Sequence, residues 1–336
     1  MSETAENRNT RPLCLISRTQ STVLKGIAIL LVLLGHTGFI TWGGAGGVAI
    51  FLIVSGYGIH SSCEQNGLKK YWRKRIRKVW IPYVIVSIFV LIGNQITDTQ
   101  VILYTLIGID FDLIADKSMW YISFIMLWYL AYYLLRVAFG RIGNYWIRNL
   151  CMVAGLFGCI FGFSELLKLN VWPEPRGTHC YLFAFPLGVG LCMLGKIRVP
   201  GRIHALVWFL ILFAGATYLF AVYQQMYDAW MALAMSMIPI AAVMLVDIHP
   251  KILPVFLWLG KYSYSLYLFE WIFIGKSEQW FSVFNNPDFS YPAMFLITGL
   301  FAVVYQNALD RILDGKGRRA GTGEPDGGTH EPGMKD

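Results

Sequence analysis

The amino-acid sequence predicts an all-α membrane protein, a polytopic bundle of about ten transmembrane helices. Hydrophobic residues make up 56% of the 336 residues and only 14% are charged, whereas about a quarter of the residues in a soluble domain are charged. A single core of a water-soluble protein of this size could not bury this much apolar surface, so lipid is the expected solvent. The net charge of +8 does not indicate nucleic acid as a partner, because most Lys and Arg residues lie between apolar runs.

Ten apolar stretches are candidates for membrane spans, because a spanning helix needs about 20 mostly apolar residues. The second and the sixth stretch are short for a span. In chain order, the expected spans are residues 24–41, 46–61, 79–94, 119–139, 146–164, 180–195, 204–223, 228–247, 254–275 and 291–309.

Basic residues gather in alternate loops between these stretches, and acidic residues gather in the opposite loops. The densest basic loop, residues 69–78 with the sequence KKYWRKRIRK, carries seven Lys or Arg residues. Cytoplasmic loops of membrane proteins carry an excess of Lys and Arg. The pattern therefore predicts ten spans with both termini in the cytoplasm, and a multi-pass protein of the inner (plasma) membrane.

The chain divides into three expected parts. Residues 1–18 form a polar, cytoplasmic N-terminal segment without a signal peptide, so the first apolar run is expected to act as both signal and anchor. Residues 19–312 form the transmembrane domain, and the Gly-rich residues 313–336 form a tail that is expected to be disordered and cytoplasmic. The six cysteines form no CxxC pair, so neither a disulfide framework nor a metal site is expected.

Two ionisable side chains of the first span suggest a site, because charges within a span are costly and are usually functional. Lys25 precedes His36 by eleven residues, which places both on one helix face, about 16 Å apart along the axis. Lys25 is expected near the cytoplasmic surface and His36 about halfway through the bilayer. This spacing suits a long anionic ligand such as a coenzyme A thioester, with phosphates at Lys25 and the basic loop. An imidazole can act as general base toward a hydroxyl; the alternative is a structural hydrogen bond to a neighbouring helix.

Glu270 lies within the ninth expected span. A carboxylate at that position needs a partner, and His36 is one candidate. The alternative is a carboxylate that faces a wet cavity.

Other polar and aromatic residues are weaker candidates for substrate binding. Ser55 and Tyr57 could hydrogen-bond into a cavity, while the neighbouring Gly56 and Gly58 suggest close helix packing. Trp120 and Tyr121 could stack on a sugar ring, although an interfacial aromatic belt is the favoured explanation. Arg176 could bind substrate at the outer mouth, whereas His60, His204, His249 and His330 are expected to be solvated.

Three motifs in order resemble the acyltransferase 3 family of membrane O-acyltransferases. They are LKGIAILLVLLGH at 24–36, IFLIVSGYGI at 50–59 and KKYWRKRIRKVWIPY at 69–83, and WLGKYSYSLYLFEW at 258–271 is similar to a late segment of the family. The resemblance implies a ten-helix protein that moves acyl groups, usually acetyl from acetyl-CoA, onto cell-surface carbohydrates.

The family's motifs map onto residues of this chain one by one. The basic-x10-His motif falls on Lys25 and His36, although the usual basic residue is Arg, which offers a bidentate fork that Lys lacks. The Ser-Gly pair falls on Ser55 and Gly56, and the late family His is replaced by Glu270. The arginine-rich segment before a proline corresponds to Arg73, Arg75 and Arg77 before Pro82.

The resulting hypothesis is a membrane O-acyltransferase with acetyl-CoA, or another acyl-CoA, as donor substrate and no permanently bound cofactor. The acceptor would be a hydroxyl of a cell-surface polysaccharide or of its lipid-linked precursor, and the surrounding partner is membrane lipid. His36 would remove the acceptor's proton or carry the acyl group briefly. Alternatives are a non-enzymatic transporter or flippase of a polysaccharide precursor, and a lipid-anchored scaffold. Dependence on acetyl-CoA separates the enzyme from the transporter.

Overall fold

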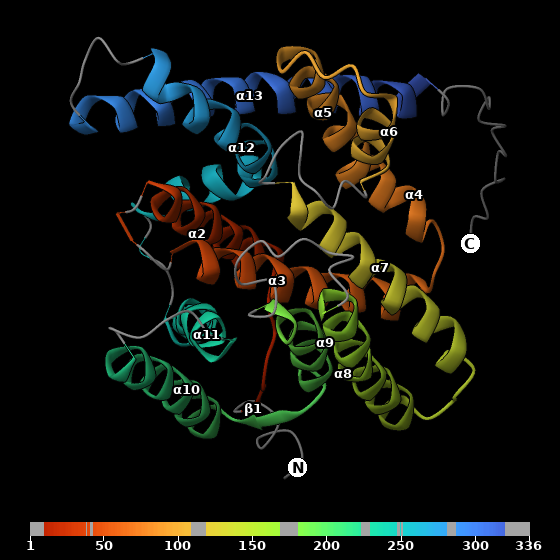
Figure 1. Ribbon diagram of the computed structural model, residues 1–336. Coiled ribbons are helices and arrows are strands. Elements are labelled where there is room, and N and C mark those ends of the chain that lie inside the picture. The colour runs from red at the N-terminus through yellow and green to blue at the C-terminus, as the bar shows by residue number, and fades with distance from the viewer. Residues whose placement is uncertain are drawn as a thin grey trace, which may run out of the picture.

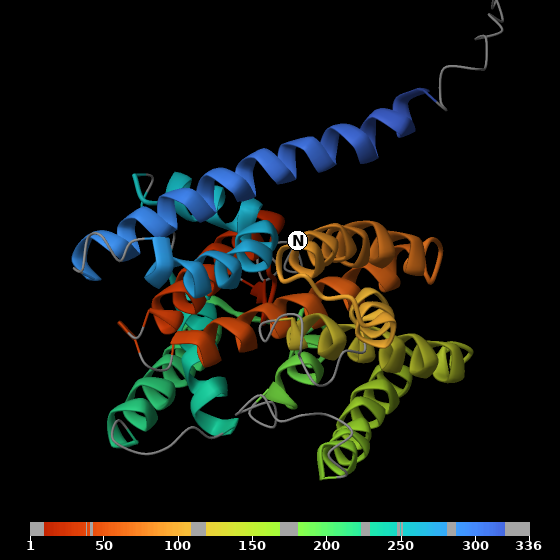
Figure 2. The same ribbon diagram turned by 45° about the horizontal axis from the view of Figure 1, so that its top comes forward.

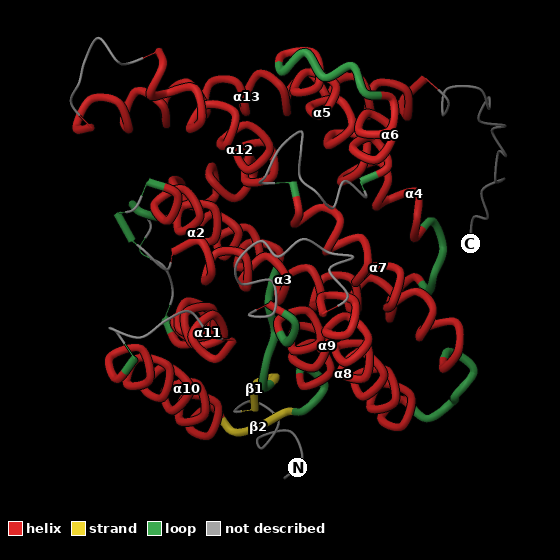
Figure 3. The backbone as a smooth tube through the Cα atoms, in the orientation of Figure 1, coloured by secondary structure: helices red, strands yellow, loops and turns green. Residues whose placement is uncertain are grey.

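The computed structural model describes residues 10–37, 39–40, 43–108, 119–168, 181–222, 229–246, 249, 251–280 and 287–319. Nearly all of these residues are helical (Figure 1, Figure 3), which confirms the all-α fold class. The helices are α2 (Arg18–His36), α3 (Gly43–Asn66), α4 (Tyr71–Arg75), the π-helix η2 (Ile76–Trp80), α5 (Ile81–Gly93), α6 (Thr99–Ile107), α7 (Trp120–Phe139), α8 (Tyr145–Lys168), α9 (Ala184–Leu194), α10 (Gly201–Ala221), α11 (Ala229–Leu245), α12 (Leu253–Trp280) and α13 (Pro287–Arg319).

Each of the ten expected spans overlaps at least one of these helices. Seven described helical segments are long and apolar enough to cross a membrane, which supports a multi-pass membrane protein. The expected spans 180–195, 228–247 and 254–275 fall on α9, α11 and α12, which are not among the seven; α9 and α11 are shorter apolar helices. At the C-terminus, α13 continues past residue 312 to Arg319, and Figure 2 shows it as a long helix across one side of the bundle.

Helix α2 differs from its expected range of 24–41. It begins after Ser17, whose side chain and Gln20 form a capping box, a common signal for a helix start. It ends at His36: Thr37 donates the last helical backbone N–H, to the Leu33 carbonyl, and Phe39 and Ile40 are no longer helical. The expected end of this helix at residue 41 is therefore wrong, because Phe39 and Ile40 lie beyond the helix.

Glycines let the central helices cross at close range, as is common in membrane proteins. A Cβ atom at any of these positions would collide with the backbone of the facing helix. The contacts are Gly26 with Phe256 and Gly260 with Thr22 between α2 and α12, Gly47 with Ala28 between α3 and α2, and Gly56 with Phe185 and Gly188 with Ile53 between α3 and α9. Helices α2 and α3 therefore form the centre on which α9 and α12 pack (Figure 1).

A short antiparallel strand pair, which the sequence did not predict, attaches the N-terminal segment to the bundle. Strand β1 (Thr10–Pro12) pairs with β2 (Arg198–Pro200), and Trp208 donates its indole N–H to the Leu13 carbonyl at 2.8 Å. Cys14 is fully buried beside this pair, and burial raises the pKa of its thiol to about 12. Part of the segment 1–18 is thus packed against the bundle, on the same side as the loop before α10.

A buried ion-pair cluster joins α3, α7 and α8. The Glu64 carboxylate lies 2.7 Å from Arg136 and 2.7 Å from Arg148, and the three side chains are 11–18% exposed. His60, one turn earlier on α3, is fully buried and within hydrogen-bond distance of the Tyr132 hydroxyl, at 3.1 Å. The expectation that His60 is solvated is therefore wrong, because α7 covers the end of α3.

Replacing Glu64 with Ala is expected to lower the free energy of unfolding by about 3 kcal/mol. The substitution leaves two largely buried guanidinium groups without their shared carboxylate, and breaking a buried ion pair by removing one partner is strongly destabilising. Thermal unfolding in detergent micelles measures the effect. Glu64→Gln, which keeps an acceptor oxygen, should lose less stability, and an unchanged unfolding curve for Glu64→Ala would contradict the structural role of the cluster.

Candidate active site

A cavity of about 890 Å³ lies between α2, α3, the α4–η2 segment, α7, α12 and α13. Its wall carries eight basic side chains and, among the described residues, one acidic side chain, Asp310. The basic residues are Lys25, Lys70, Arg73, Lys74, Arg75, Arg77, Lys78 and Lys261. A cavity with this excess of positive charge attracts anions.

Helical spacing explains why these cations face the same space. On α2, Ser21, Lys25 and Val32 follow one another at intervals that keep one face, and all three line the cavity. The basic loop predicted at residues 69–78 is helical, and it presents Arg73 and Arg77, four residues apart, to the cavity.

Arg75 is held in place by aromatic rings. Its guanidinium lies 4.8 Å from the Tyr71 ring centroid and 5.6 Å from that of Tyr129, which are cation–π distances. Tyr129 also lines the cavity.

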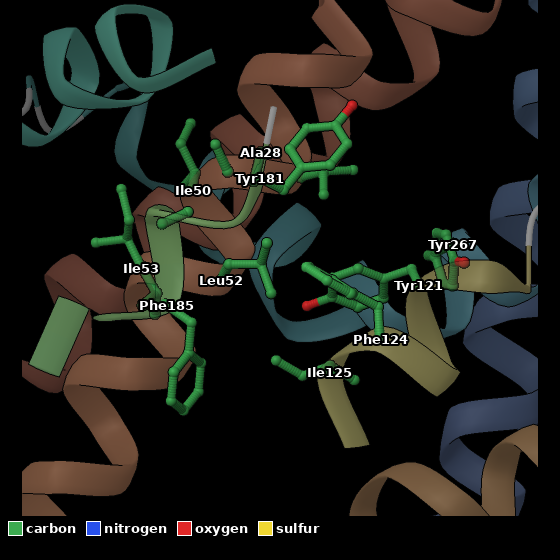
Figure 4. Close-up of a cluster of buried hydrophobic side chains, with 14 of the residues drawn as sticks. Ala28, Ile50, Leu52, Ile53, Tyr121, Phe124, Ile125, Tyr181, Phe185 and Tyr267 are labelled. Atoms are coloured by element: carbon green, nitrogen blue, oxygen red, sulfur yellow. The ribbon is translucent and has the colours of Figure 1, made fainter. Parts of the chain in front are cut away.

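The inner end of the cavity is apolar and aromatic. Val32 and Val48 meet there with Phe51, and Tyr121 contacts Tyr267 edge to face, with ring centroids 5.5 Å apart. Figure 4 shows the side chains of Tyr121 and Tyr267 close together beside the buried core. Polar groups are thus concentrated toward the basic segment, and the opposite end can hold a small, uncharged group.

His36 and Glu270 form a pair one helical turn beyond this inner end. The His36 Nδ1 atom lies 3.1 Å from a Glu270 carboxylate oxygen, and the carboxylate is fully buried while the imidazole is 31% exposed. Val32 precedes His36 by one turn, Tyr267 precedes Glu270 by almost one, and both line the cavity.

The structure gathers most of the predicted residues around this cavity. Lys25, Ser55 and Tyr121 line it together with the arginines at 73, 75 and 77, and the predicted pairing of His36 with Glu270 is present. In the described part of the chain, no group of three or more His, Cys, Asp or Glu side chains is placed to hold a metal ion.

Other predicted residues lie elsewhere. Tyr57 is two residues from Ser55, about 200° around α3, and its hydroxyl accepts a hydrogen bond from the Ile16 backbone N–H at 3.0 Å. Trp120 stacks on Tyr181 with ring centroids 5.4 Å apart and is not part of the cavity wall. Arg176 falls outside the described residues.

Sequence reasoning missed the contribution of the last helix. Gln306 and Asp310 of α13 both line the cavity, and Gln306 donates to Asp310 at 3.0 Å while it accepts a hydrogen bond from Ser265 at 2.7 Å. A glutamine within the expected span 291–309 was the available signal, because uncompensated amides are unfavourable in lipid.

The seven apolar helical segments indicate a multi-pass membrane protein, and five of them contribute to the wall of the positively charged cavity. A model of the acyltransferase 3 family, described as an acyltransferase domain, matches residues 19–305. The match covers most of the chain, so the chain belongs to this family, and its activity is the transfer of acyl groups. Comparisons with curated proteins and with solved structures gave no match.

Proposed function

We propose that this protein is a membrane O-acyltransferase that uses an acyl-CoA, by default acetyl-CoA, from the cytoplasm. The acceptor is a hydroxyl of a cell-surface polysaccharide or of its lipid-linked precursor. One observation carries the proposal: a single cavity extends from a cluster of cations to within one helical turn of a His–Glu pair.

Donor binding follows from charge and shape. Arginine guanidiniums bind phosphate oxygens bidentately, so Arg73 and Arg77, with Lys25 opposite, suit the phosphates of coenzyme A. The cavity volume of about 890 Å³ is at the upper end of the range for small-molecule sites, which fits a long nucleotide thioester. The pantetheine arm would extend toward Val32, with the thioester near His36.

Catalysis needs a base of fixed orientation. With the Glu270 carboxylate accepting a hydrogen bond from Nδ1–H, the Nε2 atom of His36 is the free basic nitrogen. It takes the proton of the acceptor hydroxyl while the oxygen attacks the thioester carbonyl. The C–S bond then breaks, and the imidazolium returns the proton to the coenzyme A thiolate. Alternatively, Nε2 attacks the thioester first, the C–S bond breaks and the coenzyme A thiolate leaves; the acceptor hydroxyl then attacks the acyl-imidazole, and its proton passes to the thiolate as Nε2 is released.

For the topology we propose ten spans in the inner membrane, with both termini in the cytoplasm. The pairing of β1 with β2 supports this arrangement, because it joins the N-terminal segment to the loop at residues 196–202. The N-terminal segment and this loop are both expected in the cytoplasm because of their basic residues. The cluster of Glu64 with Arg136 and Arg148 likewise brings together two further segments expected on that side.

The function is tested with the purified full-length protein in lipid nanodiscs. Radiolabelled acetyl-CoA is supplied with surface polysaccharide or lipid-linked sugar, and acetyl incorporation is counted. Acetyl-CoA-dependent labelling is the expected result. Sugar movement across proteoliposomes without any acetyl-CoA dependence would instead favour the transporter.

Enlarging Gly58 is expected to obstruct the donor. Gly58 lines the cavity, and a Cβ atom there would meet nothing within 4 Å, so a larger side chain enters the cavity without disturbing helix packing. Gly58→Leu should raise KM for acetyl-CoA at least about tenfold, a loss of about 1.4 kcal/mol in binding. Steady-state kinetics measure it.

The matched control is Gly190→Leu on α9, where a Cβ atom also meets nothing within 4 Å and which is not part of the cavity wall. It should keep the wild-type KM. If Gly58→Leu binds acetyl-CoA as the wild type does, the donor does not occupy this cavity.

A further inference from the structure

The arginine-rich segment contains a wide helical turn. Helix α4 continues into the π-helix η2, in which Ile81 donates its N–H to the Ile76 carbonyl, and then into α5. Such turns are rare and frequently lie at functional sites. Pro82 follows at once, and proline has no N–H to donate to the preceding turn. The carbonyl of residue 77 or 78, which would pair with a donor at position 82, therefore lacks that helical partner, and the regular pairing of the backbone is interrupted here.

Two tyrosines from the other side of the bundle donate hydrogen bonds to carbonyls at and just after this turn. Tyr264 of α12 donates its hydroxyl hydrogen to the Val79 carbonyl at 2.7 Å, and Tyr305 of α13 donates to the Pro82 carbonyl at 2.7 Å. Tyr305 is braced by the Phe269 ring, edge to face, with centroids 5.2 Å apart. The wide turn is thus fixed from two helices at once.

The wide turn sets how far the arginine-rich segment before it is rotated relative to α5. One extra residue in a turn rotates the side chains on its two sides by about 100° relative to each other. Arg73 lies before the π-helix and Arg77 within it, and both face the cavity. If the turn relaxed to a regular α-helix, Arg73 and Arg77 would still share one face, but the segment that carries them would rotate by about 100° relative to α5 and therefore relative to the cavity.

We propose that Tyr264 and Tyr305 are positioning residues that set the direction of the arginines for the phosphate end of the donor. This inference rests on the proposed function. Tyr264 itself lines the cavity, whereas Tyr305 is not part of its wall. An effect of Tyr305 on donor binding therefore has to pass through the wide turn.

The test compares Tyr305→Phe with Tyr262→Phe in the full-length protein. Tyr262 is a buried tyrosine of α12 that packs against Trp258, outside the cavity wall. KM and kcat are measured for acetyl-CoA and for S-acetyl-pantetheine, which has the same thioester but no phosphate. Tyr305→Phe should raise KM for acetyl-CoA about two- to tenfold, the value of one hydrogen bond, and leave kcat and all S-acetyl-pantetheine constants unchanged. In a double variant with Arg77→Gln, Tyr305→Phe should raise KM for acetyl-CoA little further.

Equal changes for both donors, or full additivity with Arg77→Gln, would overturn the inference. Tyr264→Phe is the second variant. Loss of folded protein in both tyrosine variants would also overturn the inference, because the two hydroxyls would then stabilise the helix bundle rather than orient the arginines. If the wild-type protein transfers no acetyl group from acetyl-CoA, the proposed function itself is refuted. A wild type that uses it, with Tyr305→Phe equal to Tyr262→Phe, would refute the positioning role alone.

Discussion

Replacing His36 with Ala is expected to lower kcat for acyl transfer by about 10²- to 10⁴-fold, the usual contribution of a general base. The imidazole lies one helical turn beyond Val32 at the inner end of the cavity, and its Nδ1 atom is 3.1 Å from a Glu270 carboxylate oxygen. KM for acetyl-CoA should change little, because the phosphate-binding residues lie at the other end. Turnover of labelled acetyl-CoA at saturating donor measures the effect.

A second variant separates catalysis from folding, because His36→Ala also removes the partner of a buried carboxylate, which is costly. His36→Gln keeps a hydrogen-bond donor near Glu270 but has no basic nitrogen. It should be folded and as inactive as His36→Ala. Glu270→Gln should retain more activity than either, since it leaves the base in place with a weaker orienting group. Full activity of well-folded His36→Gln would exclude His36 as base and as acyl carrier.

Adding a single methyl group at Gly188 is expected to prevent stable folding. The Cβ atom of Gly188→Ala would collide with the Ile53 backbone carbonyl of α3, and backbone cannot move aside as a side chain can. Overpacking typically costs about 1–3 kcal/mol and occasionally more. We expect at least the upper value here, because α9 must separate from α3. Fluorescence-detected size-exclusion chromatography after heating reports the loss.

Gly190→Ala is the matched control, on the same helix two residues away. A Cβ atom there meets nothing within 4 Å, and Ala favours helix by about 1 kcal/mol over Gly, so this variant should be as stable as the wild type or more so. Equal stability of the two variants would show that α9 and α3 do not cross as closely as described.

The sequence was sufficient for the helices and for the main chemical groups of the site. Apolar runs reveal helices because lipid requires internally satisfied backbone, and charged residues within such runs, such as Lys25 and His36, stand out. The end of α2 could not be predicted, because Phe39 and Ile40 extend the apolar run and only tertiary contacts show that the chain turns before them.

Long-range partners were the harder part. No neighbouring residue indicates that the Tyr305 hydroxyl donates to the Pro82 carbonyl. Nor does the local sequence show that Gln306 lines a cavity together with α2 and α3, which lie more than 200 residues earlier in the chain. His60 looked solvated because it follows an apolar run near a polar stretch, and only the packing of α7 on α3 buries it. Glu270, in contrast, stood out by its charge within an apolar run, and the family resemblance added that the family has a His at this position.

The cavity wall combines α2, near the start of the chain, with α13, near its end. During synthesis, the cationic half of the wall therefore enters the membrane well before α12 and α13 exist to close it. A nascent chain therefore carries Lys25 and the arginines before Gln306 and Asp310 of the opposite wall are made. Truncation before α12 should leave a membrane protein with an open, incomplete cavity.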